Sequence, residues 1–219
     1  MRGDLARHSA ELARIVEIAR GSVVTVQAGL SLGAGVMVAP HRVVTCWHVL
    51  RAGGCLTVTA ERTTSEARVL AKDEGNDLAL LEVGVLAPVA RFGGPVKPGA
   101  VVVAIGSPGG RAQFVTGGIV ARVGGVVDVI GGSRLLGAVE IDCRVRKGNS
   151  GGGLFDVEGR LVAILAAGRA ADDTGAGVSV AHVLRLLDAM GMRGQQPRDR
   201  LDIDQMRDVF RNAVRRRGA

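Results

Sequence analysis

The sequence predicts an all-β protein in two halves. From about residue 23 to 182, short Val-rich runs alternate with turn signals and give about a dozen strands at regular spacing. Hydrophobic residues make up 47% of the chain and aromatic residues only 2%, so the core must be built from Val, Leu, Ile and Ala. The Gly- and Pro-rich stretch ARFGGPVKPGA, at 90–100, is typical of a linker. We therefore expect a pair of barrels or sandwiches joined at this point.

Helices are expected on both sides of the strands. Residues 4–20 form an amphipathic helix with apolar residues near one face, namely Leu5, Leu12, Ile15, Val16 and Ala19. Residues 181–190 form a short closing helix. After the polar break RGQQPRDR, Asp202 can cap a last helix with an apolar stripe of Met206, Val209, Phe210, Ala213 and Val214. The predicted division is a helix over 1–20, halves over 21–95 and 96–192, and a tail over 193–219.

The positive charge of the chain is concentrated in the tail. The net charge is +7, and residues 193–219 hold eight Arg and four Asp, whereas 21–192 are close to neutral. A basic tail can bind nucleic acid or an anionic membrane. This tail lacks interleaved aromatic residues and a long basic helix, so we expect a solvated helix end and neither partner.

Cysteine usage and the N-terminus bear on the compartment. Cys46, Cys55 and Cys143 are odd in number and lack metal-like spacing, which argues against a disulfide framework or a zinc site. No apolar run is long enough to span a bilayer. The first 20 residues carry charges throughout and lack the apolar core of a signal peptide. We therefore expect a cytoplasmic location.

The stretch RVRKGNSGGGLF raises the question of a nucleophile, because Ser150 lies among glycines. A serine nucleophile needs a base, and the base needs an acid that holds it. His48 follows a β-branched strand in RVVTCWHVL, and Asp77 precedes the apolar run LALLEV. Taken alone, His48 fits a packed or surface residue and Asp77 a turn residue. His48 and Asp77 lie before the linker and Ser150 lies after it. The three residues can therefore meet in a cleft between the two halves.

Four segments then resemble one family. VVTCWHVL, NDLALLEV, AIGSPGG…VTGGIVA and GNSGGGLFD are similar to the trypsin-like serine peptidases, closest to the bacterial HtrA (Deg) branch, over about 22–189. The resemblance implies two antiparallel β-barrels with the active site in their cleft, and no metal or cofactor. It also implies that Ser150 attacks the scissile carbonyl, His48 accepts its proton and Asp77 orients His48. The N–H groups of Gly148 and Ser150, with Asn149 close by, would form the oxyanion hole.

The chain departs from this family at several points. Asn149 stands where digestive trypsins have Asp, so their zymogen switch is absent and loop ordering would set activity. No PDZ domain follows the second barrel. Arg144, Arg146 and Lys147 replace the small and apolar residues that HtrA proteins have before the nucleophile. The usual disulfide cysteines are missing, which is consistent with a reducing compartment.

The resemblance also implies a substrate pocket. Arg144 aligns with its floor, and the other lining residues are Ala166, Ala167 and Gly168, which would pair with the substrate as an added strand, and Gly177 and Ser179 on the far wall. Arg144 suggests an acidic residue before the scissile bond. HtrA proteins suggest a small aliphatic residue, which we favour. Cys46 could be an alternative nucleophile, but its spacing suits a buried filler better.

The leading hypothesis is a serine endopeptidase that acts on unfolded protein or on one dedicated target. The alternative is a catalytically silent or partner-activated binding module, against which the three intact residues His48, Asp77 and Ser150 speak. By resemblance the protein could be a homo-trimer, with the helix at 4–20 as one candidate contact.

Overall fold

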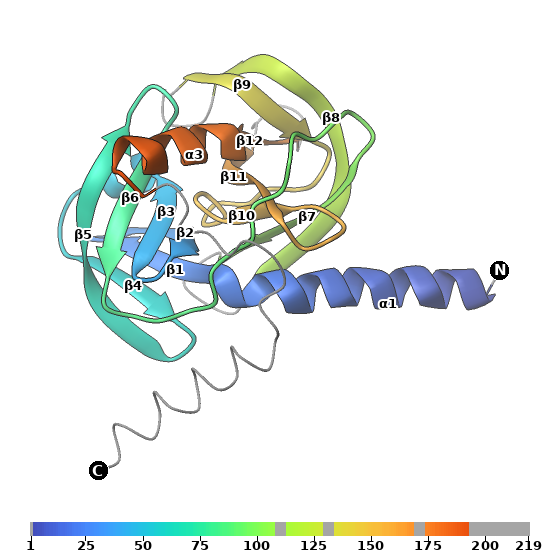
Figure 1. Cartoon of the computed structure of the whole chain (residues 1–219), viewed down its shortest axis with the longest axis horizontal. Helices are drawn as coiled ribbons and strands as arrows, with labels where there is room; N and C mark the ends of the chain where they lie inside the picture. The colour runs from blue at the N-terminus through green and yellow to red at the C-terminus, as the bar shows by residue number, and fades with distance from the viewer. Residues whose placement is uncertain (1, 108–112, 129–133, 169–173, 193–219) are drawn as a thin grey trace, which may run out of the picture.

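Two closed antiparallel β-barrels of six strands each form the body of the protein (Figure 1). This is a computed structural model, and it describes residues 2–107, 113–128, 134–168 and 174–192. The two barrels confirm the predicted fold class. The tail at 193–219, with its expected helix, lies outside the described residues. Within the described ranges, no helix has the length and apolarity needed to cross a membrane.

The first barrel closes in the order β1-β2-β3-β6-β5-β4. Its strands are β1 (Val23–Ala28), β2 (Ser31–Ala39), β3 (Arg42–Cys46), β4 (Leu56–Ala60), β5 (Thr63–Asp73) and β6 (Leu78–Val83), and the short helix α2 (Trp47–Leu50) follows β3. β3 pairs with β6 in a register that sets Cys46 opposite Leu78 and Arg42 opposite Glu82. The residue after β3 and the residue before β6 therefore lie at the same end of this pair.

The second barrel closes in the order β10-β11-β12-β9-β8-β7. Its strands are β7 (Val101–Gly106), β8 (Phe114–Asp128), β9 (Arg134–Ile141), β10 (Gly153–Phe155), β11 (Leu161–Gly168) and β12 (Gly175–Ser179). Where the turn-like glycines of ARVGGVV predict a break between two strands, β8 runs on as one strand. Gly124 has φ +87, and the pairing register with β9 shifts on either side of Gly125, so the glycines form bulges instead of a turn.

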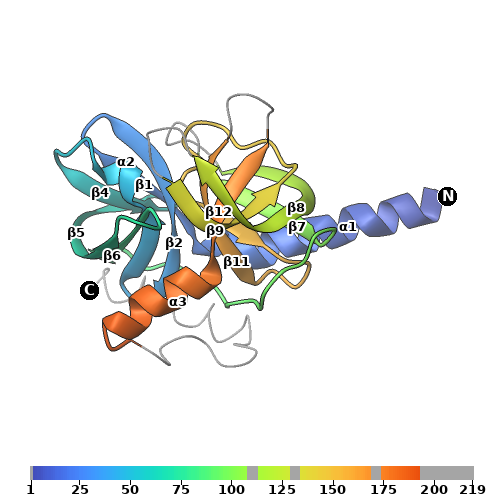
Figure 2. The ribbon, with the colours of Figure 1, turned by 90° about the horizontal axis from the view of Figure 1, so that it is seen from above.

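Helices pack on the outside of the barrels. The last turns of α1 (Arg2–Ala19) bury Ile15 and Ala19, and Ile18 packs so closely on Gly159 that a Cβ there would lie 2.7 Å from its Cγ2. The N-terminal part of α1 projects away from the barrels, and Leu12 is 43% exposed (Figures 1 and 2). The helix α3 (Val180–Ala189) leaves β12 and reaches back to the first barrel (Figure 2).

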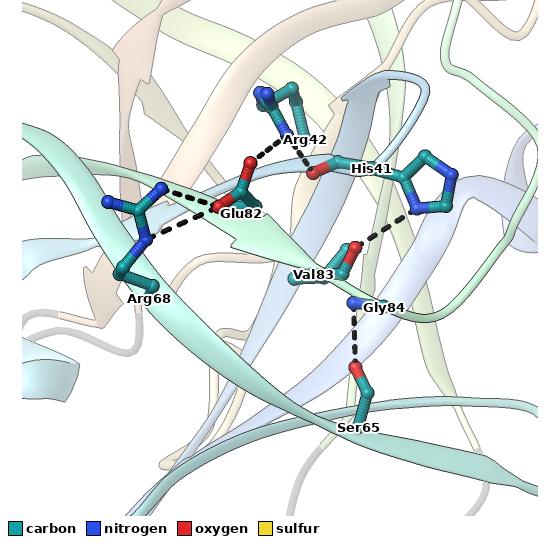
Figure 3. A network of polar contacts seen from close by, with 7 residues as sticks. All are labelled: His41, Arg42, Ser65, Arg68, Glu82, Val83 and Gly84. Atoms are coloured by element: carbon teal, nitrogen blue, oxygen red, sulfur yellow. Dashed lines mark hydrogen bonds and ion pairs between the residues drawn. The ribbon is translucent and has the colours of Figure 1, made fainter.

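A polar network fixes the far end of the β3–β6 pair (Figure 3). Glu82 accepts hydrogen bonds from the guanidinium of Arg68, at 2.6 and 3.2 Å, and forms an ion pair with Arg42 at 3.1 Å. His41, at φ +59, is tied to Val83 in both directions: Val83 N–H donates to His41 O at 3.1 Å, and His41 Nδ1 lies 3.0 Å from Val83 O. These contacts hold β3, β5 and β6 in one register.

The two arginines lower the pKa of Glu82, through the hydrogen bond of Arg68 first and the charge of both. A carboxylate whose pKa is lower in the folded state stabilises the fold above its unfolded pKa and loses that effect as the pH falls through the folded pKa. We expect Glu82→Gln to lower Tm at pH 7 by no more than about 2 °C, because exposed ion pairs contribute little. The difference should shrink below the ordinary glutamate pKa of 4.5 and in high salt.

Thermal unfolding at pH 7 and pH 3 measures this difference. Glu66→Gln is the matched control, because Glu66 is exposed on the neighbouring strand β5 and forms no ion pair among the described residues. A Tm difference for Glu82→Gln that persists unchanged at pH 3 would contradict the assignment.

Candidate active site

His48 and Asp77 form a double contact at one end of the β3–β6 pair. His48 lies in α2, directly after β3, and Asp77 lies directly before β6. The backbone N–H of His48 donates to Asp77 Oδ1 at 2.8 Å, and His48 Nδ1 lies 2.5 Å from Asp77 Oδ2. The Asp77 side chain is fully buried, whereas that of His48 is 18% exposed. The imidazole is therefore held through Nδ1, and its Nε2 is left for other chemistry.

The backbone at Asp77 is strained. Its φ of +53 lies in the left-handed region, which Asp tolerates better than bulky residues. The turn is supported by Asp73, which accepts from the backbone and side chain of Asn76 at 3.0 and 2.7 Å. Trp47 N–H also donates to Asp77 O at 3.0 Å. Strain of this kind persists where the surroundings over-determine it, as is common at functional sites.

The backbone around Ser150 is hydrogen-bonded to both barrels. Ser150 O accepts from Ala34 N–H of β2 at 2.8 Å, and Gly151 N–H donates to Leu165 O of β11 at 2.7 Å. Gly151 has φ +86, and a Cβ there would lie 2.0 Å from Ala34 O. Only glycine fits this close approach. The serine is therefore held at the junction between the halves.

The turn before Ser150 has the geometry of a type II turn. Asn149 N–H donates to Arg146 O at 2.9 Å, and Gly148, the third residue of the turn, has φ +96. Among the residues that the structure describes, no backbone acceptor takes the N–H of Gly148 or of Ser150. These two groups are thus available as an anion-binding pair, whereas Asn149 N–H is used by the turn.

The side chain of Asn149 is buried and incompletely paired. It is 1% exposed, and its Oδ1 has no hydrogen-bond partner in the described part of the chain. It lies against Gly106, the last residue of β7, where a Cβ would come within 2.8 Å of Oδ1. The end of β7 therefore supports the loop that carries Ser150.

The hydroxyl of Ser150 does not contact His48 in this structure. Its Oγ donates to Ala166 O at 2.9 Å, and no hydrogen bond joins it to His48 among the described side chains. The pairing of β11 with β12 shifts register between Leu165 and Ala167, so Ala166 is the extra residue of a bulge. The structure thus joins His48 to Asp77, while the hydroxyl of Ser150 is turned toward β11.

The residues expected to bind substrate lie in different settings. Ala166 is buried, while Ala167 and Gly168 continue β11 and pair with Ala176 and Gly175 of β12. Gly177 is buried against β11. Ser179 caps α3 by accepting from Ala181 N–H at 3.3 Å.

Arg144 is exposed, and its backbone O accepts from Thr116 Oγ1 at 3.1 Å. The next residue, Val145, turns inward instead, and a Cβ at Gly175 would lie 2.4 Å from its Cγ2 and 2.9 Å from Ile141 Cγ1. The sequence-based reading missed Val145, because the alternation of side chains along this segment is visible only once its neighbours are known.

The chain belongs to the trypsin-like peptidase domain family, whose model matches residues 33–164. It is 35% identical over 139 residues to a probable periplasmic serine endoprotease DegP-like of Pseudomonas fluorescens, covering 61% of this chain and 29% of that protein. A protein of the same description from Brucella suis is 36% identical over 130 residues, covering 56% and 24%. The chain thus spans less than a third of the length of these relatives.

Solved structures share the fold. The Rv3671c protease from M. tuberculosis in its active form has a TM-score of 0.74 and 28% identity, covering 84% of this chain and 86% of that one. Its inactive form has a TM-score of 0.70 and 30% identity, covering 81% and 92%. The HtrA-type protease AlgW with a tripeptide has a TM-score of 0.74 and 26% identity, covering 84% and 64%. The resemblance to HtrA protease domains is confirmed.

The expectation of a cytoplasmic location is wrong, because the relatives are named periplasmic endoproteases. That expectation rested on the start of a chain that covers only a part of those relatives, so the start carries no information on export. The lack of a disulfide pattern was equally uninformative, since an oxidising compartment permits disulfides but does not require them.

We expect Gly151→Ala to slow the reaction of Ser150 with a fluorophosphonate by at least about 100-fold, the size of a lost oxyanion donor. The added Cβ would meet Ala34 O and displace the loop. Gly99→Ala is the matched control, because Gly99 has φ +85 and open space around its Cβ position. It should lower Tm by about 2–8 °C and leave labelling within about twofold.

Labelling is followed by intact mass, and folding by circular dichroism. Equal labelling rates for the folded Gly151→Ala and Gly99→Ala variants would show that the close approach to Ala34 does not matter for the site.

Proposed function

We propose that the protein is a serine endopeptidase that hydrolyses peptide bonds through His48, Asp77 and Ser150, with an acyl-enzyme intermediate. The observation that carries this proposal is the double hydrogen bond from His48 to the buried Asp77, at 2.8 and 2.5 Å. The backbone of Ser150 and Gly151 is bonded to both barrels, which supports the same proposal. Membership of the trypsin-like peptidase family supports it.

In this mechanism Asp77 fixes the tautomer of His48 with the proton on Nδ1, so that Nε2 accepts the proton of Ser150 Oγ. The resulting imidazolium then gives this proton to the leaving amine. The N–H groups of Gly148 and Ser150 donate to the oxyanion of the tetrahedral intermediate. Water attacks the acyl-enzyme with His48 again as the base, and Ser150 is released. No step needs a metal or a cofactor.

Substrate binding would release the serine from its resting contact. On one edge of β11, β10 pairs only as far as Ile164, and Leu165 O accepts the N–H of Gly151 in the loop of Ser150. Among the described residues, Ala166–Gly168 therefore have no paired strand on this edge of β11. An extended substrate can add there as a strand. Its N–H would compete with Ser150 Oγ for Ala166 O. The hydroxyl would then turn to His48.

The same resting contact favours a second candidate. A protein in which Ser150 stays bonded to Ala166 O until a partner binds would be a partner-activated or silent binding module. The two candidates differ in whether the isolated chain reacts with a serine-directed reagent.

We favour a small aliphatic residue before the scissile bond. The supporting observation is that apolar atoms of Val145 and Ile141 both lie against Gly175 of β12, while Arg144 is exposed. Unfolded protein or one dedicated target remains the substrate class.

Because the relatives are named periplasmic, we propose that the protein acts in the periplasm. The projecting part of α1 is a candidate contact for a homo-oligomer, which light scattering would detect.

The first test is labelling of the wild-type chain by a fluorophosphonate. Ser150→Ala should abolish labelling, and His48→Ala should slow it at least about 1000-fold, because a triad member without its partners loses most of its reactivity. His182→Ala is the matched control, since His182 is also half-buried but lies on α3. A folded wild-type chain that takes no label would favour the partner-activated or silent module.

The second test is cleavage of peptides that differ only before the scissile bond. We expect kcat/KM for Val to exceed that for Asp at least about tenfold, because an uncompensated charge in an apolar pocket is costly. Arg144→Ala should leave Val cleavage within about threefold, and Val145→Ala should raise cleavage after Leu. A preference for Asp that disappears in Arg144→Ala would show instead that Arg144 reads an acidic residue.

A further inference from the structure

Cys46 lies close to the His48–Asp77 pair, where the first barrel contacts the second. It is the last residue of β3 and is fully buried. Its Sγ donates to Leu165 O of β11 at 3.2 Å. One ligand atom each of Cys46, His48 and Asp77 lie within 4.8 Å of one another. The thiol therefore contacts the strand that supports the serine and lies close to Asp77.

Leu165 O has a second donor, Gly151 N–H, at 2.7 Å. Gly151 follows Ser150, so one carbonyl oxygen accepts from the serine loop and from the residue that precedes α2. The path of contacts from Ser150 to β3 is thus Ser150, Gly151, Leu165 O and Cys46. Its members come from both barrels.

The thiol stays protonated. Burial raises the pKa of Cys46 well above its ordinary value, and the negative charge of the nearby Asp77 acts in the same direction. A thiol of this kind is a donor and a poor nucleophile. It is equally a poor metal ligand, because a metal needs the thiolate.

We propose that Cys46 is a positioning residue whose S–H group, by donating to Leu165 O, ties β3 and the His48–Asp77 pair at its end to the strand that holds the loop of Ser150, and so sets the distance between the two halves of the active site. This role rests on the proposed peptidase function and goes beyond the buried filler that the sequence suggests. Ala166, the next residue of β11, has no side-chain donor, so the thiol is well placed to supply this link.

Donor and volume are separated by three substitutions. Cys46→Ser keeps a donor in a smaller side chain, Cys46→Val keeps apolar volume without a donor, and Cys46→Ala removes both. Cys143 is the matched control, because it is 2% exposed, burial raises the pKa of its thiol to about 11, and it lies outside the triad. Cys143→Ala should behave like the wild type in all assays.

The first measurement is the kinetics of peptide hydrolysis. We expect kcat to fall about three- to tenfold in Cys46→Ala and Cys46→Val, with KM unchanged, and to return to within about twofold of wild type in Cys46→Ser, which is the size of one modest hydrogen bond. The proposal would be overturned if Cys46→Val were as active as the wild type while Cys46→Ser were impaired. Side-chain volume and not the hydrogen-bond donor would then matter.

The second measurement does not need activity. In the Ser150→Ala background, the proton between His48 Nδ1 and Asp77 gives a downfield ¹H NMR signal that reports on this short contact. We expect Cys46→Val to shift this signal and Cys46→Ser to leave it near its place. An unmoved signal in folded Cys46→Val would overturn the proposal. If Cys46→Val shifts the NMR signal but the wild-type chain takes no fluorophosphonate label, the result counts against the peptidase function alone.

Discussion

The pairing of β3 with β6 is the constraint on which the site depends. One register sets Cys46 opposite Leu78, and the residues beyond these two positions are the helix with His48 and the turn with Asp77. A slip by one residue would turn every side chain of β3 to the other face and separate the histidine from its acid. The network around Glu82 fixes this register at the far end of the same strands.

The second constraint is the close approach of the serine loop to both barrels. Gly151 lies where any side chain would collide with Ala34 O, and its N–H bonds to Leu165 O on the opposite side. The loop is thereby held between β2 and β11 by backbone hydrogen bonds on both sides. The price of this arrangement is a backbone conformation that only glycine adopts readily. Preorganisation of this kind costs stability during folding, so that little rearrangement is needed when charge develops on a substrate.

The fold and the pairing of His48 with Asp77 could be predicted because they rest on local patterns: strand alternation, a histidine after one strand and an aspartate before another. The resting bond of Ser150 to Ala166 O could not be predicted, because it depends on a bulge in β11. The inward direction of Val145 could not be predicted for the same reason, since the direction of a side chain depends on partners far away in the sequence. Cys46 was read as a filler, because its acceptor lies 119 residues away.

If Ser150 forms an acyl-enzyme with the help of His48 and Asp77, the acyl group must be found on Ser150 during turnover. The first measurement is therefore rapid mixing of the protein with a Val p-nitrophenyl ester, followed by mass analysis of the quenched chain. We expect a burst of about one p-nitrophenol per chain and an acyl group on the peptide that contains Ser150. The absence of both turnover and adduct in the folded protein would show that Ser150 is not a working nucleophile.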